Sequence, residues 1–503
     1  MVSRRRATVS SAIANGANTL IVAFQSILLL PLFLRYIGKA AYGAWGGTGD
    51  ILLWMQAFDL GLPNLMGQRI AAAHAQNDRT MVGRWLATGL LVLGVVSLLL
   101  IAVALGLSPF LPRLFSDLSS TDAERLSKAF ALAGIGAGLV MINNGALVYA
   151  RSVQRPSFLN AVMTGAALAN LGVTLFFLLR GAGLYAIAYG ILARSLLQSF
   201  ASTIFVVIEL RRGLSESFRF DKSVFGEAMK LMPATLLGGL AYAALNQSEL
   251  LILNLTVGAV ATASFLGIRR AAELVRALSD SVAFSSYSSF AHLVSSPDQE
   301  RAGTVLEELT DIRVVLSIVL LTPYLAVNSS FVLVWLKGQV FPDPLLTLAI
   351  AAQTLVIGGG FLANYLYRAS GELVRGSWFL ALEAVVRVAA MYGLSKIFGY
   401  IGLPIGAIVT ALPAWILTQH ALGIRLHKRH RPTSIRGKIW AVRASILVAA
   451  SVVGFTAVHA SWAYVLGVAT SAAAGAFLIL LGVEPSMERF RLRLRTTLRG
   501  SAA

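Results

Sequence analysis

The sequence predicts an all-α polytopic membrane protein with about 14 transmembrane helices. Of its 503 residues, 57% are hydrophobic and only 13% are charged, whereas about a quarter are charged in a soluble globular protein. The mean hydropathy is +0.74. Apolar stretches of about 20 residues, the length that crosses a bilayer, recur along the whole chain. These observations argue against a soluble enzyme, and no stretch is polar enough for a separate water-soluble domain.

Fourteen apolar segments have the length of a membrane span. In chain order they cover 12–34, 41–66, 85–108, 127–150, 156–179, 182–209, 223–253, 259–293, 312–336, 343–367, 375–396, 399–423, 440–459 and 462–482. The first segment follows Arg4, Arg5 and Arg6 and lacks a clear small-residue cleavage site. It is also too long for the apolar region of a cleavable signal peptide, so we expect it to remain as the first span.

The positions of Lys and Arg predict the orientation, because cytoplasmic loops of membrane proteins carry an excess of both. With the N-terminus in the cytoplasm, 28 of the 42 Lys and Arg residues fall in inside segments and 8 in outside loops. Arg313, at the start of the ninth predicted span, is counted among the inside residues. This distribution predicts that both termini are cytoplasmic.

The formal net charge of +19 raises the question of a nucleic-acid partner. Much of the charge lies in two basic clusters next to predicted spans, at 425–431 and 489–495. Such clusters suit an anionic inner leaflet, at about 1 kcal/mol per charge. We therefore expect anionic lipids as partners of the basic cytoplasmic loops and tail, and not nucleic acid. The chain has no cysteine, which excludes disulfides and thiolate metal sites.

The chain resembles itself at an offset of 220 residues. Gly38 matches Gly258, each in a short predicted turn between two spans, and Asp78 matches Asp298. The shared offset and the matching topology predict that spans 1–6 and 7–12 are parallel six-helix repeats. Such repeats form two lobes around a central cavity in many transporters. Spans 13 and 14 follow as two additional C-terminal helices.

The repeat divides the chain into five parts. We predict an N-terminal lobe at 1–210, a cytoplasmic linker at 211–222, a C-terminal lobe at 223–430, spans 13–14 at 431–482 and a basic cytoplasmic tail at 483–503.

Several motifs resemble those of a known family. The segment PLFLRYIGKAAYGAW at 31–45 is followed by DLGL at 59–62 and RIAA at 69–72. The seventh span adds Met232 and Pro233. These motifs are similar to the opening and the seventh span of the bacterial polysaccharide flippases. That family belongs to the multidrug/oligosaccharidyl-lipid/polysaccharide (MOP) exporter superfamily.

The resemblance implies a function in surface polysaccharide or exopolysaccharide biosynthesis. It implies a flippase in the bacterial inner membrane that moves oligosaccharides linked to polyprenyl diphosphate from the cytoplasmic to the periplasmic leaflet. Alternating access between two lobes would move the substrate, driven by an ion gradient or the membrane potential. The polysaccharide polymerase and the chain-length machinery are candidate partners, and we expect a monomer.

Charged residues inside the predicted eighth span are candidate site residues, because a charge at mid-bilayer costs about 2.5 kcal/mol or more. Arg269 and Arg270 lie near its middle, followed by Glu273, Arg276 and Asp280. The functional interpretation is that the arginines bind the diphosphate, since guanidinium offers a planar fork for phosphate oxygens. The alternative is a row of salt bridges that only stabilises the fold, with Arg276 neutralised by Glu273 and Asp280.

Asp50 is the counterpart of Arg270 at the offset of 220. We expect the two residues at equal depth, where Asp50 would pair with Arg270 and release it when the anionic head group arrives. The freed carboxylate could then couple transport to a proton or a cation, with Glu249 as a second coupling candidate. The alternative is a permanent buried ion pair, which is weak evidence of stabilisation.

Three polar residues inside predicted spans could bind sugar hydroxyls: Gln25, Asn246 and Gln247. The alternative is that they tie transmembrane helices together. Glu383 and Arg387 stand four residues apart, which predicts a structural bridge. Gly358 to Gly360 is a candidate bending point of the tenth span, with close helix packing as the equal alternative.

The chain lacks a Walker A sequence, and therefore its own P-loop ATP site. Neither a His-Glu-x-x-His motif nor a convincing nucleophile or metal constellation occurs, so we predict no enzyme, no metal and no cofactor. Two alternatives stay open. One is a MOP exporter of another substrate, a drug or a peptidoglycan lipid precursor. The other is a membrane polysaccharide polymerase or glycosyltransferase, although such enzymes usually have larger outside loops.

Overall fold

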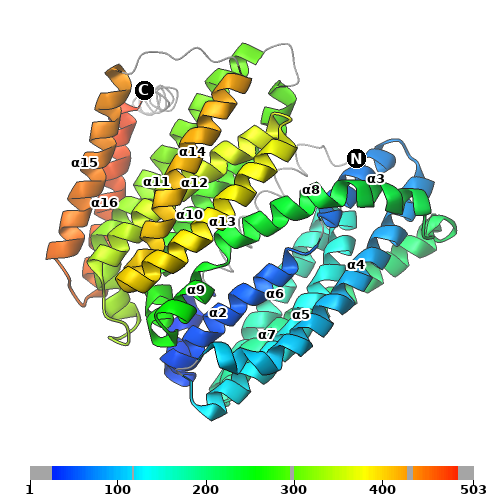
Figure 1. The fold of residues 1–503 in the computed structure, drawn as a ribbon, viewed down its shortest axis with the longest axis horizontal. Helices are drawn as coiled ribbons and strands as arrows, with labels where there is room; N and C mark the ends of the chain where they lie inside the picture. The colour runs from blue at the N-terminus through cyan, green and yellow to red at the C-terminus, as the bar shows by residue number, and fades with distance from the viewer. Residues whose placement is uncertain are drawn as a thin grey trace, which may run out of the picture. The chain divides into compact units, whose positions relative to one another are not determined.

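A computed structural model describes residues 25–484 except Ser26, Leu60, 116–117, Gln154, 295–298 and 427–433. All regular secondary structure in these residues is helical, which confirms the all-α prediction (Figure 1). Several predictions fall outside the described residues: most of the first span, the three N-terminal arginines, most of the basic segment 425–431 and the tail 489–495.

The chain divides into two compact units, Met1–Ala263 and Ser264–Ala503. The first unit contains the short helix Ile27–Tyr36, α2 (Lys39–Gln56), α3 (Leu62–Ala75), α4 (Arg79–Leu107), η1 (Ser108–Leu114), α5 (Ser120–Ser152), α6 (Pro156–Leu179), α7 (Leu184–Glu209), η2 (Leu210–Leu214), η3 (Ser215–Ser217), α8 (Lys222–Asn246) and α9 (Glu249–Thr256). The predicted lobes at 1–210 and 223–430 stay a prediction.

The second unit holds nearly all of α10 and the helices that follow it. They are α10 (Ala259–Val294), α11 (Gln299–Trp335), α12 (Pro344–Ala369), α13 (Leu373–Phe398), η4 (Gly399–Ile401), α14 (Gly402–Arg425), α15 (Ser434–Thr456) and α16 (Trp462–Val483). Within this unit α12 packs against α14, and α11 packs against α15 and α16.

The length and composition of these helices fit a membrane. Nine helical segments of the described chain are long and apolar enough to cross a bilayer, and the bent helix α8 would be a tenth. Large apolar side chains are exposed along them, among them Leu98, Phe200 and Val385. A surface of this kind suits lipid, since water would penalise so much exposed apolar area. The count of fourteen spans stays a prediction.

The internal repeat is visible in the order and start of the helices. α2 and α10 begin 220 residues apart, and so do α4 and α11. Gly38 and Gly258, which precede α2 and α10, both have a positive φ, 89° and 106°. Glycine adopts this conformation at little steric cost, so each glycine lets the chain turn sharply before the next helix.

Two predicted spans are interrupted in the structure. The segment 41–66 divides into α2 and α3, and at this break the Asp59 carboxylate accepts a hydrogen bond of 2.8 Å from the Gly61 N–H. The segment 223–253 divides into α8 and α9. α8 also bends by 51° between Lys222–Lys230 and Thr235–Asn246, around Pro233. Proline removes one backbone donor and kinks a helix, so this bend has an identifiable cause.

In the first unit, α5 packs against both α4 and α7. The backbones of α4 and α5 approach closely, because Ser97 on α4 donates a hydrogen bond of 2.6 Å to the carbonyl of Gly138 on α5. Small residues such as glycine permit this approach between membrane helices. This packing positions the ends of α4 to α7, where charged side chains gather.

Candidate functional site

Asp50 lies at the break between α8 and α9. Its Oδ2 accepts hydrogen bonds from the backbone N–H groups of Leu250, at 2.8 Å, and Leu251, at 3.0 Å. These groups belong to the first turn of α9, where backbone N–H groups have no partner within the helix. The helix dipole also favours a negative charge there. Asp50, which is 5% exposed, therefore caps α9 from a neighbouring helix.

Other residues of α2 bind the same junction. Trp54 Nε1 donates to the carbonyl of Gln247, at 3.0 Å. Asn254 Nδ2 of α9 donates to the carbonyl of Gly43 on α2, also at 3.0 Å. Positions 43, 50 and 54 follow the spacing of one helix face. One face of α2 therefore holds the interrupted helix, and we call this the α2–α9 junction.

The structure brings three of the predicted site residues to this junction: Asp50, Gln247 and Glu249. Glu249 is buried in the first turn of α9. Asn246, the last residue of α8, donates a hydrogen bond of 2.7 Å to the Tyr242 carbonyl. Gln25 donates one of 3.0 Å to the carbonyl of Ala167, which ties its helix to α6. The predicted sugar-binding roles of Gln25, Asn246 and Gln247 stay predictions.

The second predicted group lies on α10, in the other unit. Arg269 Nε and Glu273 Oε1 are 2.8 Å apart, and Arg270 Nη1 and Glu273 Oε2 are 2.5 Å apart. One carboxylate thus contacts two adjacent guanidinium groups. Arg276 Nε lies 3.5 Å from Asp280 Oδ2, as expected. These pairs follow from the spacing of three and four residues along a helix.

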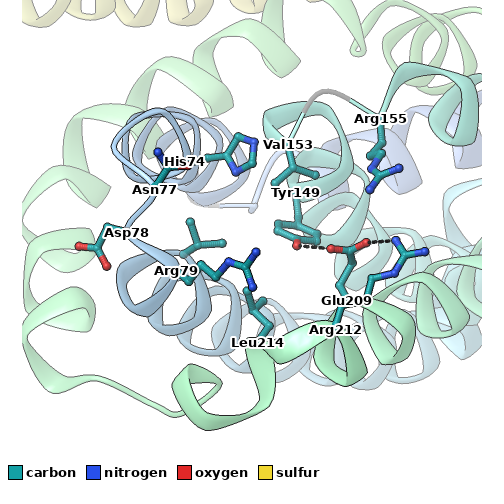
Figure 2. A pocket seen from close by; sticks show the side chains of 11 residues that line it. His74, Asn77, Asp78, Arg79, Tyr149, Val153, Arg155, Glu209, Arg212 and Leu214 are labelled. Atoms are coloured by element: carbon teal, nitrogen blue, oxygen red, sulfur yellow. Dashed lines mark hydrogen bonds and ion pairs between the residues drawn. The ribbon is translucent and has the colours of Figure 1, made fainter. Parts of the chain in front are cut away.

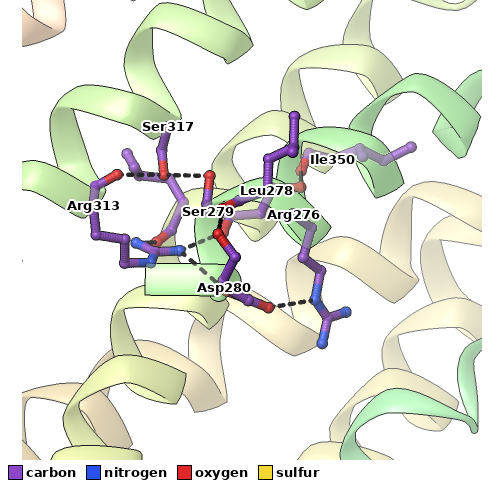
Figure 3. A network of polar contacts seen from close by, with 10 residues as sticks. Arg276, Leu278, Ser279, Asp280, Arg313, Ser317 and Ile350 are labelled. Atoms are coloured by element: carbon purple, nitrogen blue, oxygen red, sulfur yellow. Dashed lines mark hydrogen bonds and ion pairs between the residues drawn. The ribbon is translucent and has the colours of Figure 1, made fainter. Parts of the chain in front are cut away.

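Arg313 of α11 joins this group, although the sequence placed it with the inside loops. It lies well inside the helix and is 1% exposed. Figure 3 shows its guanidinium on the side of Asp280. Its Nη1 donates to the Leu355 carbonyl of α12 at 3.3 Å, and its Nη2 lies 4.0 Å from Asp280 Oδ1. Ser279 and Ser317, whose hydroxyl oxygens are 3.0 Å apart, tie α10 to α11 beside it.

Gly358 in the neighbouring helix α12 makes room for Arg313. A Cβ at position 358 of α12 would overlap the Arg313 guanidinium. α12 runs as one helix through Gly358 to Gly360, and a Cβ at Gly358 or Gly359 would overlap Arg313 or Trp415, as the packing alternative expects at these two positions. The bending point stays a prediction. The sequence cannot show which residue a glycine makes room for, and Arg313 was missed for that reason.

We call these four arginines and two carboxylates the α10 arginine cluster: Arg269, Arg270, Arg276, Arg313, Glu273 and Asp280. Its formal charge is +2. The side chains of Arg269, Arg270 and Arg276 are 18%, 21% and 26% exposed. Partly exposed guanidinium groups in a dry environment bind phosphate oxygens with strong charge-assisted hydrogen bonds. The cluster therefore has the chemistry to bind an anion.

The remaining predictions concern single pairs and metals. Glu383 and Arg387 form the predicted ion pair on α13. Asp50 and Arg270 belong to different units, and their predicted pairing stays a prediction. Within the described part of the chain, no group of three or more His, Asp or Glu residues could hold a metal ion.

No family model matches the sequence, and no curated protein matches it either. Solved structures match in fold. An inward-facing multidrug resistance MATE family transporter of the MOP superfamily aligns with a TM-score of 0.59 and 16% identity, over 83% of this chain and 98% of that one. An outward-facing structure of a multidrug resistance MATE family transporter aligns with a TM-score of 0.59 and 14% identity, over 82% of this chain and 96% of that one.

A MOP superfamily transporter from Pyrococcus furiosus gives a TM-score of 0.58 at 14% identity, over 82% of this chain and 95% of that one. This chain has the fold of the MOP superfamily transporters. The MOP fold, the long apolar helices and the composition together describe a multi-pass membrane protein. At these identities the likeness concerns the fold and not the substrate.

Proposed function

We propose that this protein is a flippase for oligosaccharides linked to polyprenyl diphosphate. It moves glycan repeat units from the cytoplasmic to the periplasmic leaflet of the bacterial inner membrane, for surface or exopolysaccharide biosynthesis. Both termini are cytoplasmic in this proposal, and the protein acts as a monomer. The polysaccharide polymerase and chain-length machinery are its proposed partners.

The observation that carries the proposal is the α10 arginine cluster. Charged residues inside a membrane span are costly, and those that are present usually serve transport. A diphosphate needs cationic partners with a planar fork, which Arg269 and Arg270 supply. Arg276 is a further proposed contact, and Arg313, which is buried, positions Asp280 and thereby Arg276.

The resemblance of the opening and seventh-span motifs supports the glycan part of the proposal. Gln25, Asn246 and Gln247 are the proposed partners of sugar hydroxyls. Alternating access is supported by the fold, because the chain aligns equally well with inward-facing and outward-facing MOP structures, each with a TM-score of 0.59.

An ion gradient or the membrane potential is the proposed energy source, with Asp50 and Glu249 as coupling residues. The α2–α9 junction supplies a mechanism for Asp50. An ionised carboxylate accepts two N–H bonds from Leu250 and Leu251, and a proton on Asp50 weakens this cap. Protonation therefore loosens the contact between α2 and α9, which allows the first unit to change conformation.

Export of a drug is a second candidate, favoured by the likeness to multidrug MATE transporters. The α10 arginine cluster argues against this candidate for cationic drugs, because its formal charge of +2 repels them. A peptidoglycan lipid precursor carries the same diphosphate, so the cluster suits this third substrate equally well.

Reconstituted vesicles test the substrate class. Purified protein is offered a polyprenyl-diphosphate oligosaccharide, a polyprenyl-diphosphate peptidoglycan precursor and an amphipathic cationic dye in separate experiments. The proposal expects transfer of the oligosaccharide between leaflets, detected as protection of the glycan from an added lectin. Transport of the dye without transfer of either lipid would replace this proposal with drug export.

A further inference from the structure

A pocket in the first unit shares no residue with the α2–α9 junction. It has a volume of about 260 Å³ and lies where α3, α5 and α7 end and α4 and α6 begin (Figure 2). Its lining includes His74, Arg79, Tyr149, Arg155, Glu209 and Arg212. The predicted orientation places it on the cytoplasmic side of the membrane. Nothing in the proposed transport mechanism uses it.

The two carboxylates of the lining are already engaged. Glu209 Oε1 lies 3.0 Å from Arg212 Nη1, and its Oε2 accepts a hydrogen bond of 3.3 Å from the Tyr149 hydroxyl. The Asp78 carboxylate accepts a bond of 3.0 Å from the Met81 N–H and points away from the other side chains (Figure 2). The acidic groups of this pocket are therefore committed to Arg212 and to a helix cap.

Arg79 and Arg155 give the pocket a positive excess. Within the described part of the chain, neither makes an ion pair with a carboxylate. Figure 2 shows Arg79 on one side of the Tyr149–Glu209 pair and Arg155 with Arg212 on the other. Arg79 is the first residue of α4 and Arg155 directly precedes α6, so the ends of these helices fix where both arginines start.

We propose that this pocket binds a phosphate-bearing anion, with Arg79 and Arg155 as its ligands. Two guanidinium groups without a carboxylate partner among the described residues offer several N–H donors to phosphate oxygens. The pocket is large enough for a phosphate group, and its position at helix ends suits a lipid head group. A soluble phosphate compound carries the same chemistry. The inference does not depend on what the protein transports.

Binding to the purified full-length protein in detergent tests the proposal. The probes are inorganic pyrophosphate, short-chain phosphatidic acid and, as an uncharged control, short-chain phosphatidylcholine. The test variant is Arg79→Gln with Arg155→Gln. The matched control is Arg113→Gln with Arg125→Gln, which removes the same charge near η1 and the start of α5. The far end of α5 lies roughly 36 Å from Arg125, because Tyr149 follows 24 residues later at 1.5 Å per residue.

We expect wild type to bind pyrophosphate, phosphatidic acid or both. For each anion that wild type binds, the control variant should have the affinity of wild type, and the test variant should bind at least tenfold more weakly. Binding of phosphatidic acid alone identifies a lipid head group, and binding of pyrophosphate identifies a soluble phosphate site. An unchanged melting temperature of the test variant excludes misfolding, and Arg155→Lys provides a milder variant. Equal binding by the test and control variants, or no binding of either anion by wild type, would overturn the proposal.

Discussion

Asp50 was expected to form an ion pair, and in the structure its carboxylate caps α9 at the break between α8 and α9. Its carboxylate is buried, which is costly unless hydrogen bonds compensate. The two N–H groups at the start of α9 supply them. Because α9 has only eight residues, a cap at its first turn matters more than it would for a long helix.

Replacement of Asp50 should destabilise α9 in a graded way. We expect Asp50→Ala to cost about 1–2 kcal/mol, the range for loss of a helix cap, and Asp50→Asn to cost less because an amide oxygen still accepts. Hydrogen exchange of the Leu250 and Leu251 amides measures the effect directly. The exposed Glu124→Ala is the control. Exchange in Asp50→Ala at the wild-type rate would contradict the assigned cap.

The sequence predicted the charged residues of α10 better than the contacts of Asp50. Spacing along one helix determines the Arg276–Asp280 and Arg269–Glu273 pairs, so a one-dimensional pattern is sufficient. Asp50 contacts residues 200 positions away, at a break that no local pattern indicated. Arg313 was missed because its partners lie on α10 and α12, two other helices.

At the scale of helices, the contact between α11 and α12 depends on one missing side chain. Gly358 leaves room for the Arg313 guanidinium, whereas a Cβ at Gly360 would make only ordinary contact, 3.6 Å from the Trp415 Cβ. These two glycines of one helix, two positions apart, therefore differ in what an added side chain would meet.

This difference gives a matched pair of variants. We expect Gly358→Ala to destabilise the protein by about 1–3 kcal/mol, because the guanidinium must move. Gly360→Ala should be neutral or stabilising by up to about 1 kcal/mol, since alanine favours helix. Thermal unfolding of both variants in detergent measures the difference. Equal melting temperatures would show that Arg313 does not occupy the space beside Gly358.

The start of α8 provides a pH-dependent contact. Asp221 Oδ1 accepts from the Ser223 hydroxyl at 2.5 Å and from the Ser223 N–H at 2.8 Å, and Oδ2 lies 2.9 Å from Arg84 Nη1. These hydrogen bonds with Ser223, and then the charge of Arg84, hold the pKa of Asp221 below its ordinary value near 3.8. The ionised carboxylate is therefore the form that stabilises the folded state.

Because the pKa of Asp221 is lower in the folded state, its carboxylate stabilises the fold at any pH above the ordinary pKa. This stabilisation is lost as the pH falls through the lowered pKa of the folded state. We expect wild type to have a higher melting temperature than Asp221→Asn at pH 7. The difference between the two melting temperatures should shrink once the pH falls below about 3.8. Melting curves of both proteins from pH 7 to pH 3 measure it. A difference that stays constant over this range would contradict the assigned ionised cap.

At the scale of the whole molecule, the resemblance of the motifs implied the MOP superfamily, while hydrophobic length and the repeat predicted an all-α membrane protein with two lobes. Both signals are properties of long segments, and the membrane allows few alternatives to helices. Breaks within these segments were less visible. Hydropathy does not separate α8 from α9, because the break at Gln247 and Ser248 is held by hydrogen bonds from Trp54 of α2. The substrate is a property of the site and not of the fold.

The proposed function depends on an anion site on α10, and Arg270 is its central residue. Loss of Arg270 removes a guanidinium fork from the proposed diphosphate contact. We expect Arg270→Ala to reduce transfer of lipid-linked oligosaccharide at least tenfold, and Arg270→Lys to retain part of it. Arg375→Ala is the matched control, because it also removes one positive charge, at an exposed arginine of α13.

The most direct measurement is the rate at which a polyprenyl-diphosphate oligosaccharide moves between leaflets of reconstituted vesicles, for these four proteins at equal amounts. We expect rapid transfer by wild type and Arg375→Ala, partial transfer by Arg270→Lys and little by Arg270→Ala. Transfer by Arg270→Ala at the wild-type rate would contradict an anion site at Arg270, and absence of transfer by wild type would contradict the proposed flippase.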